Sequence, residues 1–537
     1  MSRRRAKTEP GAQCDGHDEL DADLAALDAE GLRDVVRTLL PGLDDGSRRR
    51  ALTEVARRAG RGDAVAGSSE AIAAEVEAFA AEARRAGYAE PVEVDIRLGA
   101  ATEAFAARDY ASAFRIYRAL LVPISAADID LGQDELVDEV LVADVDACAR
   151  QFVVAMYMTS SAQRRAKAVL AAIREVEGVG LFDAPLEALD RTAVEALPDF
   201  DDFVADWRAL VEMQVAEVAG RGRGRWEQAW LREAVARVEG PAGLGELARG
   251  TRRVEDLRAW CDACEDAADW AATRAAFEEA AALVEHPAHT SAAFLDGAAG
   301  AAIRLGADDV DAALERAWRR APTLGRLRRW LGAVGSRPDL VQRAGVALAS
   351  LPTAAERQRA LLLLLRGEYA SVARLVADAA GQGWAEPSHP GPLVFPIFVR
   401  LLAPPERSAQ YARALGPMGG FDLSMDIETF MASDVHALET PDVDALLARA
   451  EVGRPADAEM RAIMLDALRT AAEKRVEGVA AGKRRRHHGQ AASLVVVCAA
   501  VDDRPDAMAW CRRVEADFGR SYPALKRAFV EAARVAE

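Results

Sequence analysis

Residues 109–120 space their aromatic and small side chains in the way expected of a helix packed against a second helix. Tyr110, Ala113, Tyr117 and Leu120 lie on one stripe of such a helix, because side chains three or four residues apart share a face. The small Ala113 lets the neighbouring helix approach closely, and the two tyrosine rings fill the space beside it. Residues 91–107 supply that neighbour, so this segment predicts a helical hairpin.

Weaker copies of the same spacing recur further along the chain. They begin at Trp270, Val310 and Tyr369, and their registers are 40 and 59 residues apart, so the repeats have no constant period. Pro123 is predicted to end the second helix of the first hairpin, because proline removes a helical hydrogen bond. We therefore predict an all-α fold, an irregular solenoid of helical hairpins in two or three subdomains.

Breaks in the helical pattern give the predicted domain boundaries. Residues 1–18 are polar and aperiodic, and we expect them to be disordered. A first helical domain spans 19–219. The alternating glycines of 220–225 form a linker, since such a run sustains neither a helix nor a packed strand. A central helical-repeat domain spans 226–403, and a Pro-Pro pair opens the C-terminal helical domain, 404–537.

Composition supports helices and excludes several functional classes. Hydrophobic residues make up 51% of the chain, and many are alanine, a strong helix former. A formal charge of −18 argues against a surface that attracts nucleic acid or anionic lipid everywhere. No apolar run approaches the roughly 20 residues of a membrane span. The basic residues 2–7 are not followed by the apolar core of a secretion signal, and the six cysteines fit a reducing compartment, so we expect a cytoplasmic protein.

The sequence carries no legible signature of catalysis. It lacks Gly-x-Ser-x-Gly, a Gly-x-Gly-x-x-Gly run after a strand, and His-Glu-x-x-His. Residues 478–483 approach a phosphate-binding loop, but they have too few residues between the glycines, and Arg484 replaces the hydroxyl residue that binds magnesium. We predict that the protein is not an enzyme and has no cofactor.

Two segments raise the question of a metal site. Cys261 and Cys264 form a Cys-x-x-Cys pair with His286 and His289 downstream, which would suit zinc, but a thiol pair one helical turn apart is more typical of helix packing. Residues 128–139 place acidic side chains at several offsets of a calcium loop, but its glycine is one position early. We expect no metal at either segment, and the sequence alone leaves both alternatives open.

Two basic clusters are candidate binding sites. The first contains Arg221, Arg223 and Arg225 and is followed by Trp226, whose ring could stack on a base. The second contains Lys483, Arg484, Arg485, Arg486 and His487. Arginine clusters bind phosphate backbones in other proteins, and the alternatives are a flexible linker and a solvated start of a helix.

The hairpin at residues 91–120 resembles the tetratricopeptide repeat, which implies stacked helical hairpins. Arg108 stands where that family usually has a glycine in the turn. Residues 483–495, together with Trp510 and Tyr522, are similar to the helical-repeat tail of bacterial SWIM-type zinc-finger proteins. The SWIM motif itself is absent, so the resemblance implies neither its zinc nor a role with nucleic acid.

Three functional hypotheses follow from the sequence. The first is a non-enzymatic scaffold whose concave surface binds a protein or peptide partner, since stacked hairpins leave a long groove. The second is a nucleic-acid-associated regulator that uses the two basic clusters. The third is an enzyme with a site that the sequence does not reveal. We favour the scaffold, with no association with a membrane.

Overall fold

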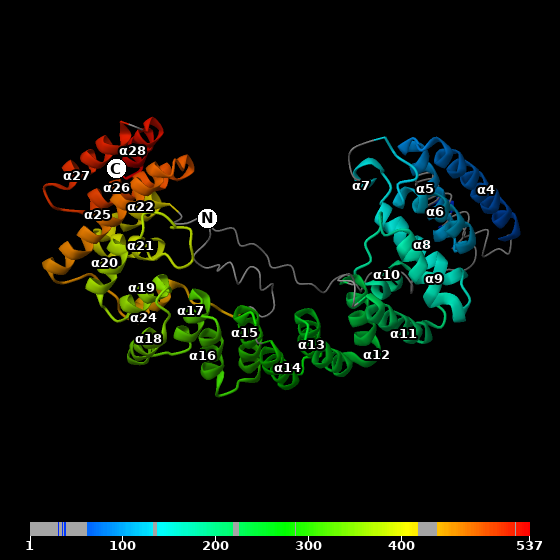
Figure 1. Cartoon of the computed structure of the whole chain (residues 1–537), viewed down its shortest axis with the longest axis horizontal. Helices are drawn as coiled ribbons and strands as arrows, with labels where there is room; N and C mark the ends of the chain where they lie inside the picture. The colour runs from blue at the N-terminus through cyan, green and yellow to red at the C-terminus, as the bar shows by residue number, and fades with distance from the viewer. Residues whose placement is uncertain are drawn as a thin grey trace. The chain divides into compact units, whose positions relative to one another are not determined.

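The computed structural model describes residues 62–132, 137–218, 225–284, 286–416, 438–520 and 522–536, together with positions 31, 35, 37 and 38. Within these ranges the regular elements are helices (Figure 1). Tyr88 and Asp130 form an isolated β-bridge. The predicted all-α class is therefore confirmed. The predicted disordered segment 1–18 lies outside the described residues. The chain divides into two compact units, Met1–Gly243 and Leu244–Glu537.

The first unit is built from helices of eight residues or more and one short turn of helix. They are α4 (Gly62–Ala86), α5 (Pro91–Ala106), α6 (Tyr110–Ser125), α7 (Val137–Val140), α8 (Val145–Thr159), α9 (Ala162–Glu175), α10 (Pro185–Thr192), α11 (Phe200–Val218) and the greater part of α12 (Arg225–Thr251). Here α6 packs on α4, α5 and α8, and α8 packs in turn on α9 and α10.

The second unit begins as a succession of neighbouring helices and ends in a bundle. Its helices are α13 (Val254–Asp266), α14 (Trp270–Leu283), α15 (Ala288–Leu305), α16 (Val310–Arg320), α17 (Leu324–Gly332), α18 (Arg337–Ser350), α19 (Glu356–Leu365), α20 (Tyr369–Asp378), α21 (Gly391–Leu402), α22 (Pro405–Leu415), α24 (Val443–Arg449), α25 (Ala458–Ala481), the 3₁₀ turn η3 (Arg485–His487), α26 (His488–Val501), α27 (Ala507–Gly519) and α28 (Pro523–Ala536). From α13 to α20 most helices pack on the next, whereas α25 and α26 gather the surrounding helices into the bundle (Figure 1).

The predicted hairpin corresponds to α5 and α6. Arg108 makes the turn in the left-handed region, with φ of 64°, where glycine would be less strained. Asp109 then caps α6 by accepting a hydrogen bond from the Ser112 backbone N–H at 3.1 Å. Ala113 and Tyr117 are fully buried, so the small residue and one ring lie inside the packed layer.

Pro123 does not end α6 as the sequence predicted. The helix continues to Ser125, and Pro123 lies in its last turn. A proline there removes one hydrogen bond near the end of the helix, where few further bonds remain to be disrupted. Its carbonyl is engaged after the helix ends, since it accepts from the backbone N–H groups of Asp128 and Ile129.

The boundary between the two units falls within the residues of α12. Gly240 has φ of 61° and ψ of −151°, values outside the helical region, and Pro241 follows it, so α12 consists of two helical segments. The predicted linker at 220–225 lies outside the described residues except for Arg225, the first residue of α12. The predicted boundary at 403/404 falls between α21 and α22, inside the second unit.

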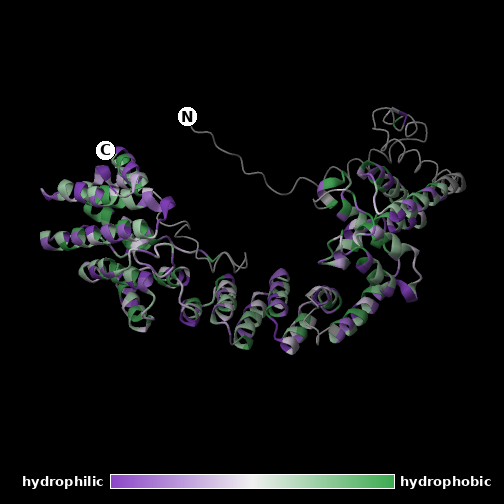
Figure 2. Ribbon diagram, turned by 45° about the horizontal axis from the view of Figure 1, so that its top comes forward, coloured by the Kyte–Doolittle hydropathy of each residue, from purple (hydrophilic) through white to green (hydrophobic). Residues whose placement is uncertain are grey.

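Most helices combine hydrophilic and hydrophobic residues along their length (Figure 2). Their apolar sides form the cores, and small residues bring some helices close together. Gly297 of α15 lies against the Phe277 ring of α14, where a Cβ atom would approach ring carbons to 2.5 Å. In the part of the chain that the structure describes, no helix is long and apolar enough to span a bilayer.

Arginine side chains hydrogen-bond the backbone where helices end. The Nη1 atom of Arg449 donates to two carbonyls at the end of α17. They belong to Gly332, at 3.0 Å, and Val334, at 2.6 Å. Arg165 reaches the carbonyls of Tyr157 and Pro198 in the first unit. Because the last carbonyls of a helix have no partner within it, a guanidinium from a neighbouring helix can satisfy them.

Candidate functional site

A pocket of about 410 Å³ opens between α5 and α8 in the first unit. Its lining residues are Asp95, Gly99, Thr102 and Glu103 of α5, and Val142, Ala143, Asp144, Ala147, Cys148 and Gln151 from the start of α8 and the turn before it. The turn is held against α5 by Asp95, whose carboxylate accepts from the backbone N–H groups of Val142 at 3.1 Å and Ala143 at 3.0 Å. Asp144 then caps α8 through the Ala147 N–H.

The floor of the pocket is a neutral hydrogen-bonded network. The hydroxyls of Thr102 and Tyr117 lie 3.0 Å apart, and the Tyr117 hydroxyl donates to the side-chain oxygen of Gln151. Burial raises the pKa of the Cys148 thiol to about 11, so it is protonated at neutral pH and is a poor nucleophile. Tyr117 thus connects the hairpin stripe read from the sequence to the pocket.

The walls of the pocket combine negative charge with an apolar rim. Asp95, Glu103 and Asp144 line it, and none of its lining residues is lysine or arginine. Val92 and Ile96 lie one helical turn apart on the outer face of α5, and their side chains are 66% and 62% exposed. Val142, in the turn before α8, is 93% exposed. Exposed aliphatic side chains beside carboxylates suit a ligand that presents a cationic group next to apolar ones. We call this surface the α5–α8 groove.

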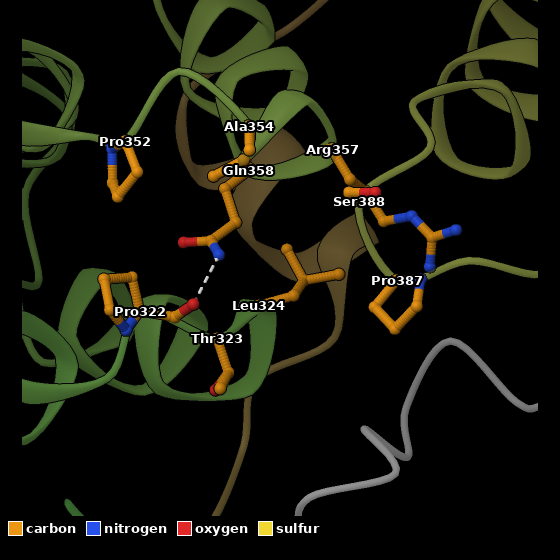
Figure 3. Close-up of a pocket in the computed structure, with 10 residues that line it drawn as sticks. Pro322, Thr323, Leu324, Pro352, Ala354, Arg357, Gln358, Pro387 and Ser388 are labelled. Atoms are coloured by element: carbon orange, nitrogen blue, oxygen red, sulfur yellow. Dashed lines mark hydrogen bonds between the residues drawn. The ribbon is translucent and has the colours of Figure 1, made fainter. Parts of the chain in front are cut away.

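A second pocket, of about 300 Å³, lies in the second unit (Figure 3). Pro322, Pro352 and Pro387 contribute to its walls, together with Leu324 and residues at the start of α19. Two of its polar side chains, Gln358 and Arg357, are engaged by the protein. Gln358 accepts from the Trp318 indole N–H and donates to the Pro322 carbonyl at 2.9 Å. This pocket therefore offers shape and apolar surface but little to specify a ligand.

Arg357, at the edge of the second pocket, is also used internally. Its guanidinium donates to the carbonyls of His389 at 2.8 Å and Glu386 at 2.7 Å. It thereby holds the segment before α21 in place.

The structure places the predicted basic residues in different units. Arg221 and Arg223 lie outside the described residues, Arg225 begins α12, and the Trp226 side chain is 48% exposed. In the second unit Lys483, Arg484, Arg485 and Arg486 are exposed and His487 is partly exposed, on the connection from α25 to α26. The second cluster is thus a compact surface patch.

The described residues do not form a metal site at either of the two segments considered from the sequence. Cys261 and Cys264 are buried in α13, whereas His286 and His289 are exposed. Burial raises the pKa of both thiols, which disfavours the thiolate that zinc requires. Among the described residues no three His, Cys, Asp or Glu side chains form a group that could hold an ion.

The calcium segment is also occupied by other interactions. Asp128 pairs with Arg84 at 2.9 Å, and the Asp130 carboxylate accepts from the Gly132 N–H at 2.8 Å. Residues 133–136 lie outside the described ranges.

Sequence reasoning missed the α5–α8 groove. One signal was present, since Val92, Val94, Ile96 and Leu98 alternate and therefore place apolar side chains on both sides of the helix. The buried side packs in the core, and the opposite side leaves Val92 and Ile96 exposed. The pairing of Asp95 with the turn at 142–143 is a tertiary contact that no local pattern encodes.

Comparisons with models of known families, with curated proteins and with solved structures found no match.

Proposed function

We propose that the protein is a non-enzymatic, cytoplasmic helical scaffold that binds a peptide segment of a partner protein in the α5–α8 groove. The observation that carries the proposal is the pocket with three carboxylates and no lining cation, beside the exposed Val92, Ile96 and Val142. The resemblance of the hairpin to tetratricopeptide repeats supports the same function. The ligand class is a segment with a lysine or arginine next to aliphatic or aromatic residues.

Two physical contributions support such binding. Coulomb attraction between the carboxylates and a cationic side chain is stronger in a partly enclosed pocket than in bulk water, because the effective dielectric constant is lower. The exposed aliphatic side chains add burial of apolar area, at about 25 cal/mol per Å² removed from water. The neutral floor can accept or donate hydrogen bonds to the tip of the bound side chain.

The absence of an activated nucleophile in the groove supports a binding rather than a catalytic role. Cys148 is the side chain there with intrinsic nucleophilicity, and burial keeps its thiol protonated. The carboxylates of Asp95 and Asp144 accept backbone N–H groups, which assigns them to holding the turn before α8.

Selection of a random peptide library on the full-length protein tests the proposal. We expect enrichment of peptides that contain lysine or arginine beside leucine, isoleucine or phenylalanine. Binding of an enriched peptide should weaken by about tenfold or more in Glu103→Lys, since one charge contact of about 1.4 kcal/mol corresponds to that factor. Ile96→Asn should also weaken binding, because it removes an apolar side chain from the rim without adding charge or disturbing a buried side chain.

Glu177→Lys is the matched control. Glu177 is exposed in the same unit and is not among the residues that line the pocket, so the change in net charge is the same and the groove is intact. Peptides of acidic character, or selected peptides whose affinity is equal in Glu103→Lys and Glu177→Lys, would show that the groove is not the binding site.

A further inference from the structure

Arg475 of α25 is a buried cation without an acidic partner among the described residues. The residue is 4% exposed, and its polar contacts are the Gly381 carbonyl and the Gln490 side-chain oxygen, at 3.4 and 3.3 Å. Its Nε atom is buried without a hydrogen-bond partner in the described structure. Burial and the charge of Arg484 lower the pKa of Arg475 to about 10, so it stays charged at neutral pH. Buried charges are normally paired, so this one calls for an anion.

His488 is a second buried polar group without a partner at the same end of α25. It begins α26, is 4% exposed, and both of its ring nitrogens lack hydrogen-bond partners among the described residues. The Trp384 indole N–H is likewise unpartnered there, and the Arg475 guanidinium lies 5.4 Å from the Trp384 ring centroid. Arg475 and Trp384 thus lie close together with unpartnered donors, and His488 adds unpartnered ring nitrogens at the start of α26, whereas buried polar groups are normally satisfied.

The surface above these groups carries unneutralised positive charge. Lys483, Arg484, Arg485 and Arg486 are exposed, and no carboxylate of the described residues pairs with any of them. Some arginines of the same bundle are paired, as Arg504 is with Asp466 and Arg513 with Glu473, whereas Arg512 makes no ion pair with the described carboxylates. The cluster is distinguished by having four such cations in consecutive positions.

The imidazole of His487 lies in the electrostatic field of several arginines. Partial burial lowers the pKa of this imidazole, and the charges of three guanidinium groups lower it further. Those groups belong to Arg475, Arg486 and Arg484, which come from α25 and from the connection to α26. The Arg486 Nε atom lies 3.1 Å from the His487 Nε2 atom. A group placed beside His487 would therefore meet positive charge from several directions.

We propose that the connection between α25 and α26, with Arg475 and His488 beneath it, binds the phosphate group of a phosphorylated ligand. A phosphate dianion supplies acceptor oxygens for the guanidinium groups and balances the unpaired charge. The cluster is compact, since its exposed cations are four consecutive residues. Binding along a nucleic-acid backbone needs contacts spaced over several phosphates, so a single phosphate group matches this site better. The site belongs to the second unit and is independent of the α5–α8 groove.

Isothermal titration of the full-length protein with inorganic phosphate, at constant ionic strength in chloride, tests the site. We expect binding with a Kd of about 1 mM or tighter, and a loss of about tenfold or more in Arg484→Glu. Arg512→Glu is the matched control, because Arg512 is exposed in the same bundle and makes no ion pair with the described carboxylates. Absence of binding, or equal weakening in both variants, would overturn the proposal.

A spectroscopic measurement keeps the test independent of variant folding. Bound phosphate should raise the pKa of His487, because it offsets the three positive charges that lower it. An NMR titration of the histidine resonances, with His487→Gln for assignment, measures this shift in the wild-type protein. An unchanged pKa at saturating phosphate would contradict the proposed geometry.

Three ligands distinguish the source of the phosphate. A phosphoserine peptide that binds at least about tenfold more tightly than inorganic phosphate would assign the site to phosphorylated proteins. A small phosphate ester that binds more tightly than the peptide would assign it to a phosphorylated metabolite. Single-stranded DNA that binds more tightly than either, with a steep dependence on salt, would overturn the assignment to a single phosphate group.

Discussion

Individual carboxylates fix the starts of helices in the first unit. Asp95 accepts from two backbone N–H groups before α8, and Glu233 of α12 accepts from those of Leu186 at 3.1 Å and Glu187 at 2.7 Å at the start of α10. The first N–H groups of a helix have no partner within it and form the positive end of its dipole, so a carboxylate is favourable there.

The pH dependence of stability tests the role of Glu233. Burial raises the pKa of Glu233 to about 7 from 4.5, although its backbone hydrogen bonds oppose the shift. A raised native pKa stabilises the protein below the unfolded pKa, and that contribution is lost as the pH rises through about 7. We expect the free energy of unfolding of the wild type to fall relative to Glu233→Gln between about pH 5 and about pH 8, as measured by urea denaturation. Parallel curves for the two proteins would contradict this.

At the scale of elements, local patterns predicted the helices well and their ends less well. The spacing from Tyr110 onward identified α6, but its end at Ser125 depends on bonds that Pro123 makes after the helix. Local spacing likewise does not fix the end of α25, which continues to Ala481. Its second half is buried against α20 and α26, and tertiary packing of this kind is not visible in a short window of sequence.

The candidate sites were predictable only in part, for a similar reason. The basic run at 483–486 is visible in the sequence, and the structure adds Arg475 and His488, which no local pattern joins to the run. The α5–α8 groove depends on contacts between segments far apart in the chain, such as Asp95 with Val142. Sequence spacing identifies one face of one helix, whereas a pocket needs two.

The close approach of α14 and α15 gives a prediction at this scale. Gly297→Ala should destabilise the second unit by about 1–3 kcal/mol, because the added Cβ would lie 2.5 Å from the Phe277 ring. Gly250→Ala, in the last turn of α12, has no atom within 4 Å of the new Cβ and should stabilise by up to about 1 kcal/mol through helix propensity. Chemical denaturation of both variants measures the difference, and a stabilising Gly297→Ala would disprove the close packing.

For the whole molecule, the division into two units falls inside a helix. The sequence drew attention to the glycine-arginine run at 220–225, because repeated glycines are an obvious breaker. The units instead divide after Gly243, close to Gly240 and Pro241, where one left-handed residue interrupts an otherwise strong helical pattern. A single backbone angle of this kind is set by the packing on each side.

Two compact units predict two unfolding transitions in calorimetry. Ala113→Leu should lower the transition of the first unit, because it overpacks a fully buried position at a cost of about 1–3 kcal/mol. Asp502→Ala should lower the transition temperature of the second unit, because its inaccessible carboxylate pairs with Arg469 and Arg504. Removing one partner of such a buried pair costs about 3–5 kcal/mol of unfolding free energy. One transition displaced by both substitutions would show that the units unfold together.

The arginines that satisfy helix ends also limit how the protein can be modified. Only five of its 68 basic residues are lysine, so acetylation and ubiquitination, which act on the lysine amine, have few positions to use. The guanidinium contacts of Arg165 and Arg449 lie beyond the reach of that chemistry. Lys474 differs, because its amine donates to the Ala377 carbonyl at 2.7 Å near the end of α20. Acetylation there would remove a positive charge from a helix C-terminus, whereas the carbonyls bound by Arg165 and Arg449 would be unaffected.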